Sequence, residues 1–205
     1  RSSGKQGHAL AAEASERGAK VHLVTTQPAT APEDLGLDVV AVDTAAEMAS
    51  AVLERSPGAD VVLMAAAVAD FRPVDVADRK IKKDVGVPEV RLESTIDILA
   101  ELGRIRTAGQ VLVGFAAETN DLRQNAAAKL QAKGVDLIVA NDVSVPEVGF
   151  EHDTNAVVLL DAGGGATEVP LCSKREVACA VLDAALHIHR TNHAGTNRPP
   201  NGDET

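Results

Sequence analysis

The segment Val61-Val62-Leu63-Met64-Ala65-Ala66-Ala67-Val68-Ala69-Asp70 carries the pattern that decides the fold. Its apolar half predicts a buried strand, and the small residues that follow leave room at the carboxyl end of that strand, where α/β sheets bind ligands. A basic run, Arg79-Lys80-Ile81-Lys82-Lys83, comes soon afterwards, although the whole chain has a formal net charge of −10. The sequence therefore predicts a pocket for a small, highly anionic ligand, such as a nucleoside triphosphate or a phosphorylated acid.

Further strands and helices alternate along the chain around this segment. Short apolar or β-branched runs predict additional strands at residues 20–25, 39–42, 90–92, 111–115 and 137–140. Helix-like segments separate most of them, at residues 7–17, from 44, 94–102 and 121–133. Thr44-Ala45-Ala46-Glu47 matches a capping box at the start of one helix. The alternation indicates an α/β fold, with a parallel sheet and helices on both faces.

The carboxyl-terminal part departs from this alternation. Residues 156–160 and 167–171 flank Asp161-Ala162-Gly163-Gly164-Gly165, which is typical of a β-hairpin, and a final helix follows at residues 173–187. Because residues 156–160 are all apolar, both faces of that strand need burial, and we expect the hairpin to lie at a homodimer interface. The polar residues 191–205 predict a disordered tail, which leaves residues 1–190 as one domain.

The composition argues against several classes of protein. Of the 205 residues, 45% are hydrophobic and 24% charged, as in a soluble globular core, but there is no Trp or Tyr. An acidic chain without aromatic stacking platforms is not expected to bind nucleic acid. No apolar run is long enough to span a membrane and no signal peptide is visible, so we expect a cytoplasmic protein. Cys172 and Cys179 lack a metal-binding spacing, so we expect ordinary reduced cysteines.

The opening Ser2-Ser3-Gly4-Lys5-Gln6-Gly7 is similar to a phosphate-binding turn. Hydroxyls and small residues let the backbone N–H groups at a helix N-terminus face an anion. The segment has neither the spacing of a P-loop nor the three glycines of a dinucleotide fingerprint. A helix start without a ligand would account for it equally well.

Three other polar features admit both a functional and a structural interpretation. The cations of residues 79–83 form either a ligand-binding or a solvated loop, and Lys129 and Lys133 share one helix face that is either solvated or turned to a ligand. Asp70 is either a turn residue or an acceptor for a sugar or base. No set of residues pairs a nucleophile with a base, which favours chemistry by positioning and electrostatics, as in phosphoryl or nucleotidyl transfer.

In their order and spacing these motifs resemble the phosphopantothenate–cysteine ligase domain of coenzyme A biosynthesis, in the bacterial form fused to a flavin-dependent decarboxylase. The resemblance extends over nearly the whole chain apart from the tail. It is carried by residues 2–7, 65–72, 80–83, 114–119 and 140–144, and by Gly149-Phe150 with Asp153 and Asn155.

The resemblance implies a Rossmann-like α/β ligase that uses CTP and Mg²⁺. In that family, 4′-phosphopantothenate and CTP form an acyl-cytidylate with loss of pyrophosphate, and the amine of L-cysteine then displaces CMP. The resemblance also implies an N-terminal decarboxylase domain that holds FMN. It further implies a homodimer in which Phe150 and Asn155 approach the neighbour's active site and the Lys80–Lys83 loop acts as a lid.

The same resemblance assigns individual residues. Lys80 would be catalytic, holding the triphosphate and the charge that develops at phosphorus. The positions that correspond to CTP-binding residues are Met64, Ala65, Ala66, Asp70, Lys80, Thr95, Ile96, Asp97, Ile98, Phe115, Lys129 and Lys133. Those expected to bind phosphate or substrate are Ser2, Ser3, Gly4 and Ala67, and no metal ligand is assigned.

The chain departs from the family pattern in two places. The family's Asn that steadies the acyl intermediate, and its Gly-rich first strand and turn, fall before Arg1. Thr95-Ile96 stands where the family often has Asn-Pro, which affects the expected geometry of that turn. Two other functions stay open, a non-catalytic nucleotide-binding or regulatory domain and an NAD(P)-dependent reductase, although the incomplete Gly fingerprint disfavours the reductase.

Overall fold

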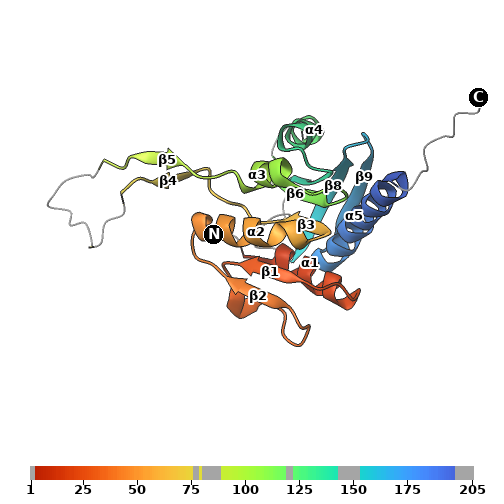
Figure 1. The fold of residues 1–205 in the computed structure, drawn as a ribbon, viewed down its shortest axis with the longest axis horizontal. Helices are drawn as coiled ribbons and strands as arrows, with labels where there is room; N and C mark the ends of the chain where they lie inside the picture. The colour runs from red at the N-terminus through yellow and green to blue at the C-terminus, as the bar shows by residue number, and fades with distance from the viewer. Residues whose placement is uncertain (1–2, 76–78, 80–88, 119–121, 143–152, 197–205) are drawn as a thin grey trace, which may run out of the picture.

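The computed structural model describes residues 3–75, 79, 89–118, 122–142 and 153–196 (Figure 1). Its centre is a five-stranded sheet in the order β3-β6-β7-β8-β9. The first three of these strands are parallel, and the last two add to them as an antiparallel hairpin. The strands are β3 (Val61–Met64), β6 (Val111–Glu118), β7 (Leu137–Asp142), β8 (Thr154–Asp161) and β9 (Ala166–Ser173).

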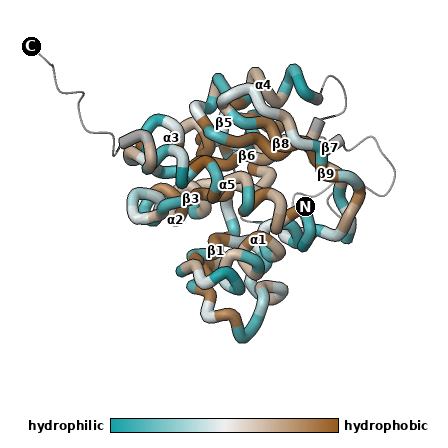
Figure 2. Tube along the Cα trace, turned by 90° about the vertical axis from the view of Figure 1, so that its right-hand side faces the viewer, coloured by the Kyte–Doolittle hydropathy of each residue, from teal (hydrophilic) through white to brown (hydrophobic). Residues whose placement is uncertain are grey.

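Helices cover both faces of this sheet (Figure 1). Alternate residues of β6 show the division, because Leu112 packs into the core under α2, α3 and α4 while Val111 and Val113 pack into the core under α1 and α5. Figure 2 shows hydrophobic residues gathered along the strands of the sheet. The helices are α1 (Lys5–Glu16), α2 (Ala45–Arg55), α3 (Ile98–Ile105), α4 (Leu122–Lys133) and α5 (Lys174–Thr196). The predicted fold class, α/β with parallel strands, two helical layers and a C-terminal β-hairpin, is confirmed.

Two smaller sheets flank the central one. The parallel pair β1 (His22–Thr25) and β2 (Asp38–Ala41) lies beside α1. A 3-10 turn at Pro28–Thr30 lies between these two strands, and another at Ser56–Gly58 follows α2. The antiparallel pair β4 (Phe71–Pro73) and β5 (Leu92–Ser94) projects away from the rest of the molecule (Figure 1).

Local signals in the sequence set several element boundaries correctly. The Thr44 hydroxyl accepts the Glu47 N–H at 3.1 Å, and the Glu47 carboxylate accepts the Thr44 N–H at 3.1 Å, so the predicted capping box begins α2. The predicted start of a helix at Ser94 is wrong, because Ser94 ends β5 and Asp97 caps α3. There the side chain of Asp97, rather than a serine hydroxyl, accepts the N–H of Ala100 at 3.0 Å.

One prediction for the carboxyl-terminal part needs correction. The last helix continues to Thr196, so disorder from Thr191 onward is wrong for residues 191–196; the Thr191 hydroxyl donates to the His187 and Ile188 carbonyls within this helix. The hairpin interface stays a prediction: α4 and α5 both contact β8 and Val157 and Leu159 are buried within the chain, whereas the other residues of the run are only partly buried. The rest of the predicted tail, residues 197–205, lies outside the described residues.

Candidate active site

The topology brings the ends of many elements to one edge of the sheet. Parallel strands β3, β6 and β7 end there, and because β8 and β9 are antiparallel, β8 begins and β9 ends at the same edge. Helix α1 also begins there, since Lys5 contacts Asp153 just before β8, and His8 contacts Thr25 at the end of β1. This carboxyl edge is where α/β sheets bind their ligands.

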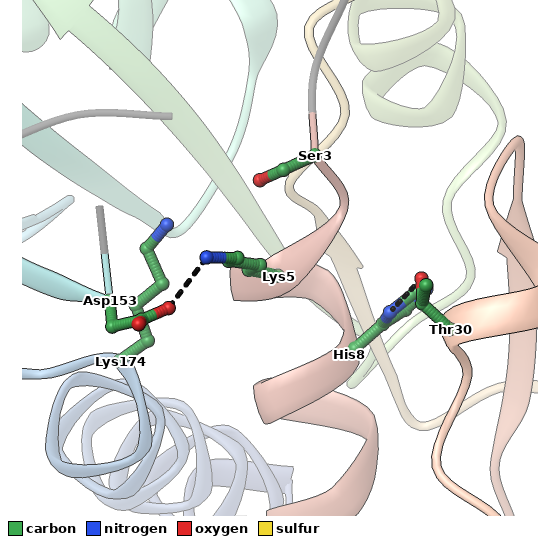
Figure 3. Close-up of a pocket in the computed structure, with 6 residues that line it drawn as sticks. All are labelled: Ser3, Lys5, His8, Thr30, Asp153 and Lys174. Carbon is green, nitrogen blue, oxygen red and sulfur yellow. Dashed lines mark hydrogen bonds and ion pairs between the residues drawn. The ribbon is translucent and has the colours of Figure 1, made fainter. Parts of the chain in front are cut away.

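A cavity of about 350 Å³ opens at this edge beside the N-terminus of α1 (Figure 3). It is formed by side chains from four separate parts of the chain, which Figure 3 shows as two groups on either side of α1. Its residues are Ser3, Lys5, His8, Thr30, Asp153 and Lys174. Ser3 and the adjacent Gly4 are predicted site residues, and Lys5 belongs to the turn that the sequence likens to a phosphate-binding turn. Asp153 was noted only among the residues that carry the family resemblance, and His8, Thr30 and Lys174 were not predicted.

The first group of side chains is predominantly cationic. The Lys5 ammonium lies 2.6 Å from the Asp153 carboxylate, and Lys174, whose exposed fraction is only 7%, lies beside this pair (Figure 3). Burial lowers the pKa of Lys174, the Lys5 charge lowers it further, and Asp153 partly opposes both effects. Two cations share one carboxylate at a helix N-terminus, which is an arrangement suited to an anion such as phosphate.

The second group centres on the buried imidazole of His8. One ring nitrogen lies 3.2 Å from the Thr25 hydroxyl and the other 3.4 Å from the Thr30 hydroxyl. Burial lowers the pKa of His8, so the ring is neutral at pH 7 and can offer one donor and one acceptor. Gly4 has φ 73°, and a Cβ there would lie 3.3 Å from the ring, so a glycine allows this close approach.

A further group of predicted residues meets on the side of the sheet covered by α3 and α4. The Thr95 hydroxyl donates to the Ala69 carbonyl, and the Thr95 N–H donates to the Asp70 carbonyl at 2.9 Å. Two residues later, the Asp97 carboxylate caps α3 and accepts the Lys133 ammonium of α4. The structure therefore connects the loop after β3, the turn before α3 and the end of α4, three segments that the family resemblance implies share one site.

The remaining predicted residues divide by burial. Met64 and Ile98 lie in the core beneath the edge, and Phe115 packs on the opposite core, under α1 and α5. Ala65 is half-buried, while the exposed predicted residues are Ala66, Ala67, Asp70, Ile96 and Lys129. Ser2 and Lys80 lie outside the described residues, as does Phe150. Asn155 is buried within its own chain.

A topological signal could have added Asp153 and Lys174 to the predicted site. The hairpin prediction implies that both its free ends return to the edge at which β7 ends, and these two residues flank the hairpin. His8 and Thr30 had no comparable signal, because their contact depends on how α1 packs against β1.

The described part of the chain holds no group of three or more His, Cys, Asp or Glu side chains arranged to bind a metal. None of its helices is both long and apolar enough to cross a membrane.

Comparison with known proteins gives consistent similarities. Residues 1–188 match the family model of the DNA/pantothenate metabolism flavoprotein C-terminal domain. The chain is 44% identical over 183 residues to the coenzyme A biosynthesis bifunctional protein CoaBC of Bacillus subtilis (strain 168), covering 89% of this chain and 45% of that protein. It is 41% identical over 187 residues to a protein named cysteine/cysteine sulfinic acid decarboxylase from an unknown prokaryotic organism, covering 91% and 52%.

Among solved structures, the crystal structure of the C-terminal domain of CoaBC superposes with a TM-score of 0.74 at 35% identity, covering 94% of this chain and 85% of that one. The chain spans about half the length of the curated relatives that it matches.

Proposed function

The chain belongs to the DNA/pantothenate metabolism flavoprotein C-terminal domain family, and from this we propose that it is the CTP-dependent ligase part of a coenzyme A biosynthesis protein. It would join 4′-phosphopantothenate to L-cysteine through an acyl-cytidylate, with release of pyrophosphate and CMP. The observation that carries the proposal is the direct linkage of Ala69-Asp70, Thr95-Asp97 and Lys133, three separate segments expected to bind the nucleotide.

The two halves of the carboxyl edge suit the two substrates. The cationic cavity with Lys5 and Lys174 is complementary to the phosphate of 4′-phosphopantothenate. The exposed Asp70 and the α3–α4 contact at Lys133 lie on the other side of the sheet, where they would hold the ribose or base and the phosphates of CTP. The sheet edge between them would position the substrate carboxylate near the α-phosphorus.

In the first step, a carboxylate oxygen of 4′-phosphopantothenate attacks the α-phosphorus of CTP. A new P–O bond forms, the bond from the α-phosphorus to pyrophosphate breaks, and pyrophosphate leaves with its electron pair. Negative charge increases on the leaving oxygens, so Lys80 would act by charge stabilisation rather than as a nucleophile. Mg²⁺ bound with the triphosphate would supply positive charge that stabilises the leaving pyrophosphate.

In the second step, the cysteine amine attacks the acyl carbon. The C–N bond forms, the bond from the acyl carbon to the phosphate oxygen breaks, and CMP leaves while the amine loses a proton. FMN would belong to a fused decarboxylase domain, consistent with a bifunctional relative of which this chain covers 45%. We further propose that the active form is a homodimer.

The test is pyrophosphate release by the full-length protein that contains this chain, with Mg²⁺ present. The proposal predicts release that requires CTP and 4′-phosphopantothenate together, and a cysteine conjugate once L-cysteine is added. CTP binding without release under any substrate combination would favour a non-catalytic nucleotide-binding domain. Tight NADPH binding without CTP binding would favour a reductase.

A further inference from the structure

A second cavity, of about 130 Å³, opens at the amino edge of the sheet, opposite the candidate active site. Two loops that lead into neighbouring parallel strands line it, residues 57–60 before β3 and residues 107–110 before β6. The carboxyl-terminal part of α5 contributes two further lining residues, His189 and His193. The proposed reaction uses none of the residues that line this cavity.

The two loops are fixed to one another by a buried side chain. Gln110 is only 3% exposed, and its side-chain amide donates to the Ser56 carbonyl at 2.5 Å and to the Ala59 carbonyl at 2.7 Å. The Val111 N–H donates to the Asp60 carbonyl at 2.9 Å. These bonds hold the loops in place without a ligand, so the cavity is preorganised.

The two histidines lie close together beside these loops. They are four residues apart and therefore share one face of α5, and their ring centroids lie 4.3 Å apart. Gly109 has φ 82°, and a Cβ there would lie 2.8 Å from Cε1 of His193, so a glycine allows the loop to lie directly against this ring. His193 is exposed, which gives an ion access to the pair from solvent.

One nitrogen of the His189 ring has no hydrogen-bond partner. Its Nδ1 is buried and meets no donor or acceptor within the part of the chain that the structure describes. A buried polar atom without a partner costs free energy, and a bound water or ion is one way in which native proteins satisfy such an atom. Because the torsion of an imidazole about its Cβ–Cγ bond is broad, this ring can turn a nitrogen toward the cavity.

The charges around the cavity favour a cation. Both histidines lie in the last turns of α5, where the helix dipole places negative partial charge. Asp60 lines the cavity, whereas the described residues that line it include no lysine or arginine. The guanidinium of Arg106 donates to the Gln110 carbonyl nearby, but it is neutralised by Asp136 at 3.0 Å.

We propose that His189 and His193 form a bidentate site for a divalent transition-metal ion such as Zn²⁺ or Cu²⁺. Two histidines at positions i and i+4 of a helix can each present a ring nitrogen to one ion, and the same spacing holds Zn²⁺ in helical His-Glu-x-x-His motifs. Imidazole suits Cu²⁺ and Zn²⁺, with Cu²⁺ bound more tightly, whereas Mg²⁺ prefers oxygen ligands.

The number of protein ligands makes this an exchangeable site. The described residues place no third His, Cys, Asp or Glu in position to bind the same ion, so water would fill the remaining coordination positions. An ion shared by two successive turns would also stabilise the end of α5. The site is independent of the proposed ligase function, because it lies at the opposite edge of the sheet.

Calorimetric titration of the full-length protein with Zn²⁺, and separately with Cu²⁺, tests the proposal. A Cys172→Ser, Cys179→Ser background removes the two thiols of this chain as competing ligands. We expect one ion per chain whose affinity falls by at least about tenfold in His193→Gln, because one helix no longer holds a second imidazole at high effective concentration. His189→Gln should have the same effect, and Mg²⁺ should not bind at this site.

The double variant His193→Gln, Ala194→His is the matched control. It keeps the number of histidines but separates the two by five residues, so they lie on different faces of α5 and should bind no better than His193→Gln alone. Zn²⁺ should raise the thermal unfolding temperature of the parent protein more than that of either variant. Ligase activity with Mg²⁺ should be unchanged in His193→Gln.

Electron paramagnetic resonance of one equivalent of Cu²⁺ identifies the ligands directly. The parent protein should show coupling to two imidazole nitrogens, and this signal should be lost in His193→Gln. Equal metal affinity of the parent and His193→Gln, tight binding restored by Ala194→His, or a Cu²⁺ signal unchanged by His193→Gln would overturn the proposal.

Discussion

In the candidate site, the side chain of Asp97 links helices α3 and α4. One carboxylate oxygen accepts the Ala100 N–H at 3.0 Å, and the other accepts the Lys133 ammonium. Burial alone would raise the pKa of Asp97, but the hydrogen bonds from Lys133 and the start of α3 outweigh it, so the pKa lies below its ordinary value. The carboxylate therefore stays charged at neutral pH and holds the Lys133 ammonium against the start of α3.

Lys129→Ala and Lys133→Ala should each weaken CTP binding more than they slow the chemical step, because α4 would meet the nucleotide at its periphery. Titration of CTP against each variant, with single-turnover rates at saturating CTP, separates the two effects. Arg104→Ala is the control, since Arg104 pairs with Glu101 on an exposed face of α3. Unchanged CTP affinity in both lysine variants would show that this face of α4 does not bind the nucleotide.

Lys80→Ala should abolish CTP turnover while leaving the fold intact. Loss of a charge-assisted phosphate contact in a site that excludes water costs roughly 2–4 kcal/mol of transition-state stabilisation. That corresponds to a rate reduction on the order of a hundredfold or more. Steady-state pyrophosphate release measures the effect. Near-normal release by Lys80→Ala would refute the assignment.

The buried His8 should make the free energy of unfolding depend on pH. Burial depresses its pKa in the folded state below the ordinary histidine value of 6.5, so the neutral ring favours folding above that pH. As pH falls below 6.5, the unfolded chain takes up the proton first, and this contribution to stability is progressively lost. His8→Gln should therefore flatten the decline in urea-unfolding free energy below pH 6.5.

Exposed His187 provides the matched control for this measurement. His187→Gln should leave the pH profile of wild type essentially unchanged. A His8→Gln profile as steep as that of wild type would show that the imidazole does not contribute to the acid destabilisation.

At the scale of elements, close backbone contact between α3 and α4 brings Asp97 within reach of Lys133. A Cβ added at Gly103 in α3 would collide with the Lys133 carbonyl, and that atom belongs to backbone that cannot rotate away. Gly103→Ala should destabilise the protein by about 1–3 kcal/mol through this overlap. It should also weaken CTP binding by separating the two helices.

Gly7→Ala in α1 provides a control of opposite sign, because a Cβ there meets nothing within 4 Å. Alanine is favoured over glycine in a helix by roughly 0.5–1 kcal/mol, so this variant should be more stable than wild type. Chemical denaturation of both variants is the measurement. A Gly103→Ala variant at least as stable as wild type would show that α3 and α4 are not held in this contact.

Elements with strong local signals were predictable from the sequence, and those that depend on distant contacts were not. Strand β3 and the capping box of α2 occur where the apolar run and Thr44-Glu47 predict them. The pairing of β4 with β5 was not predicted from the sequence. Both strands are three residues long, they contain Pro73 and charged residues, and some twenty residues separate them in the chain. Helix α5 exceeded its predicted end because Thr191 bonds back to its own helix.

For the whole molecule, the predicted α/β topology determines at which edge of the sheet the site lies. Only some of the residues that form the site could be predicted from the sequence. The turn at Ser3-Gly4 could be predicted from its own motif, and the Asp97 position from the family resemblance. The cavity also needs Asp153 and Lys174, which meet Lys5 and Gln6 only after the hairpin returns to the edge where α1 begins. Local sequence patterns cannot predict a contact between residues so far apart in the chain. The order and direction of the strands can predict it.

The same architecture predicts the path of individual oxygen atoms through the reaction. If the substrate carboxylate attacks the α-phosphorus at this edge, the bridging oxygen stays on phosphorus when the cysteine amine displaces CMP. With 4′-phosphopantothenate labelled with ¹⁸O in its carboxylate, mass spectrometry should therefore find one ¹⁸O in the CMP and none in the pyrophosphate. Label in inorganic phosphate or pyrophosphate, or unlabelled CMP alongside a formed cysteine conjugate, would contradict activation of the carboxylate by cytidylyl transfer.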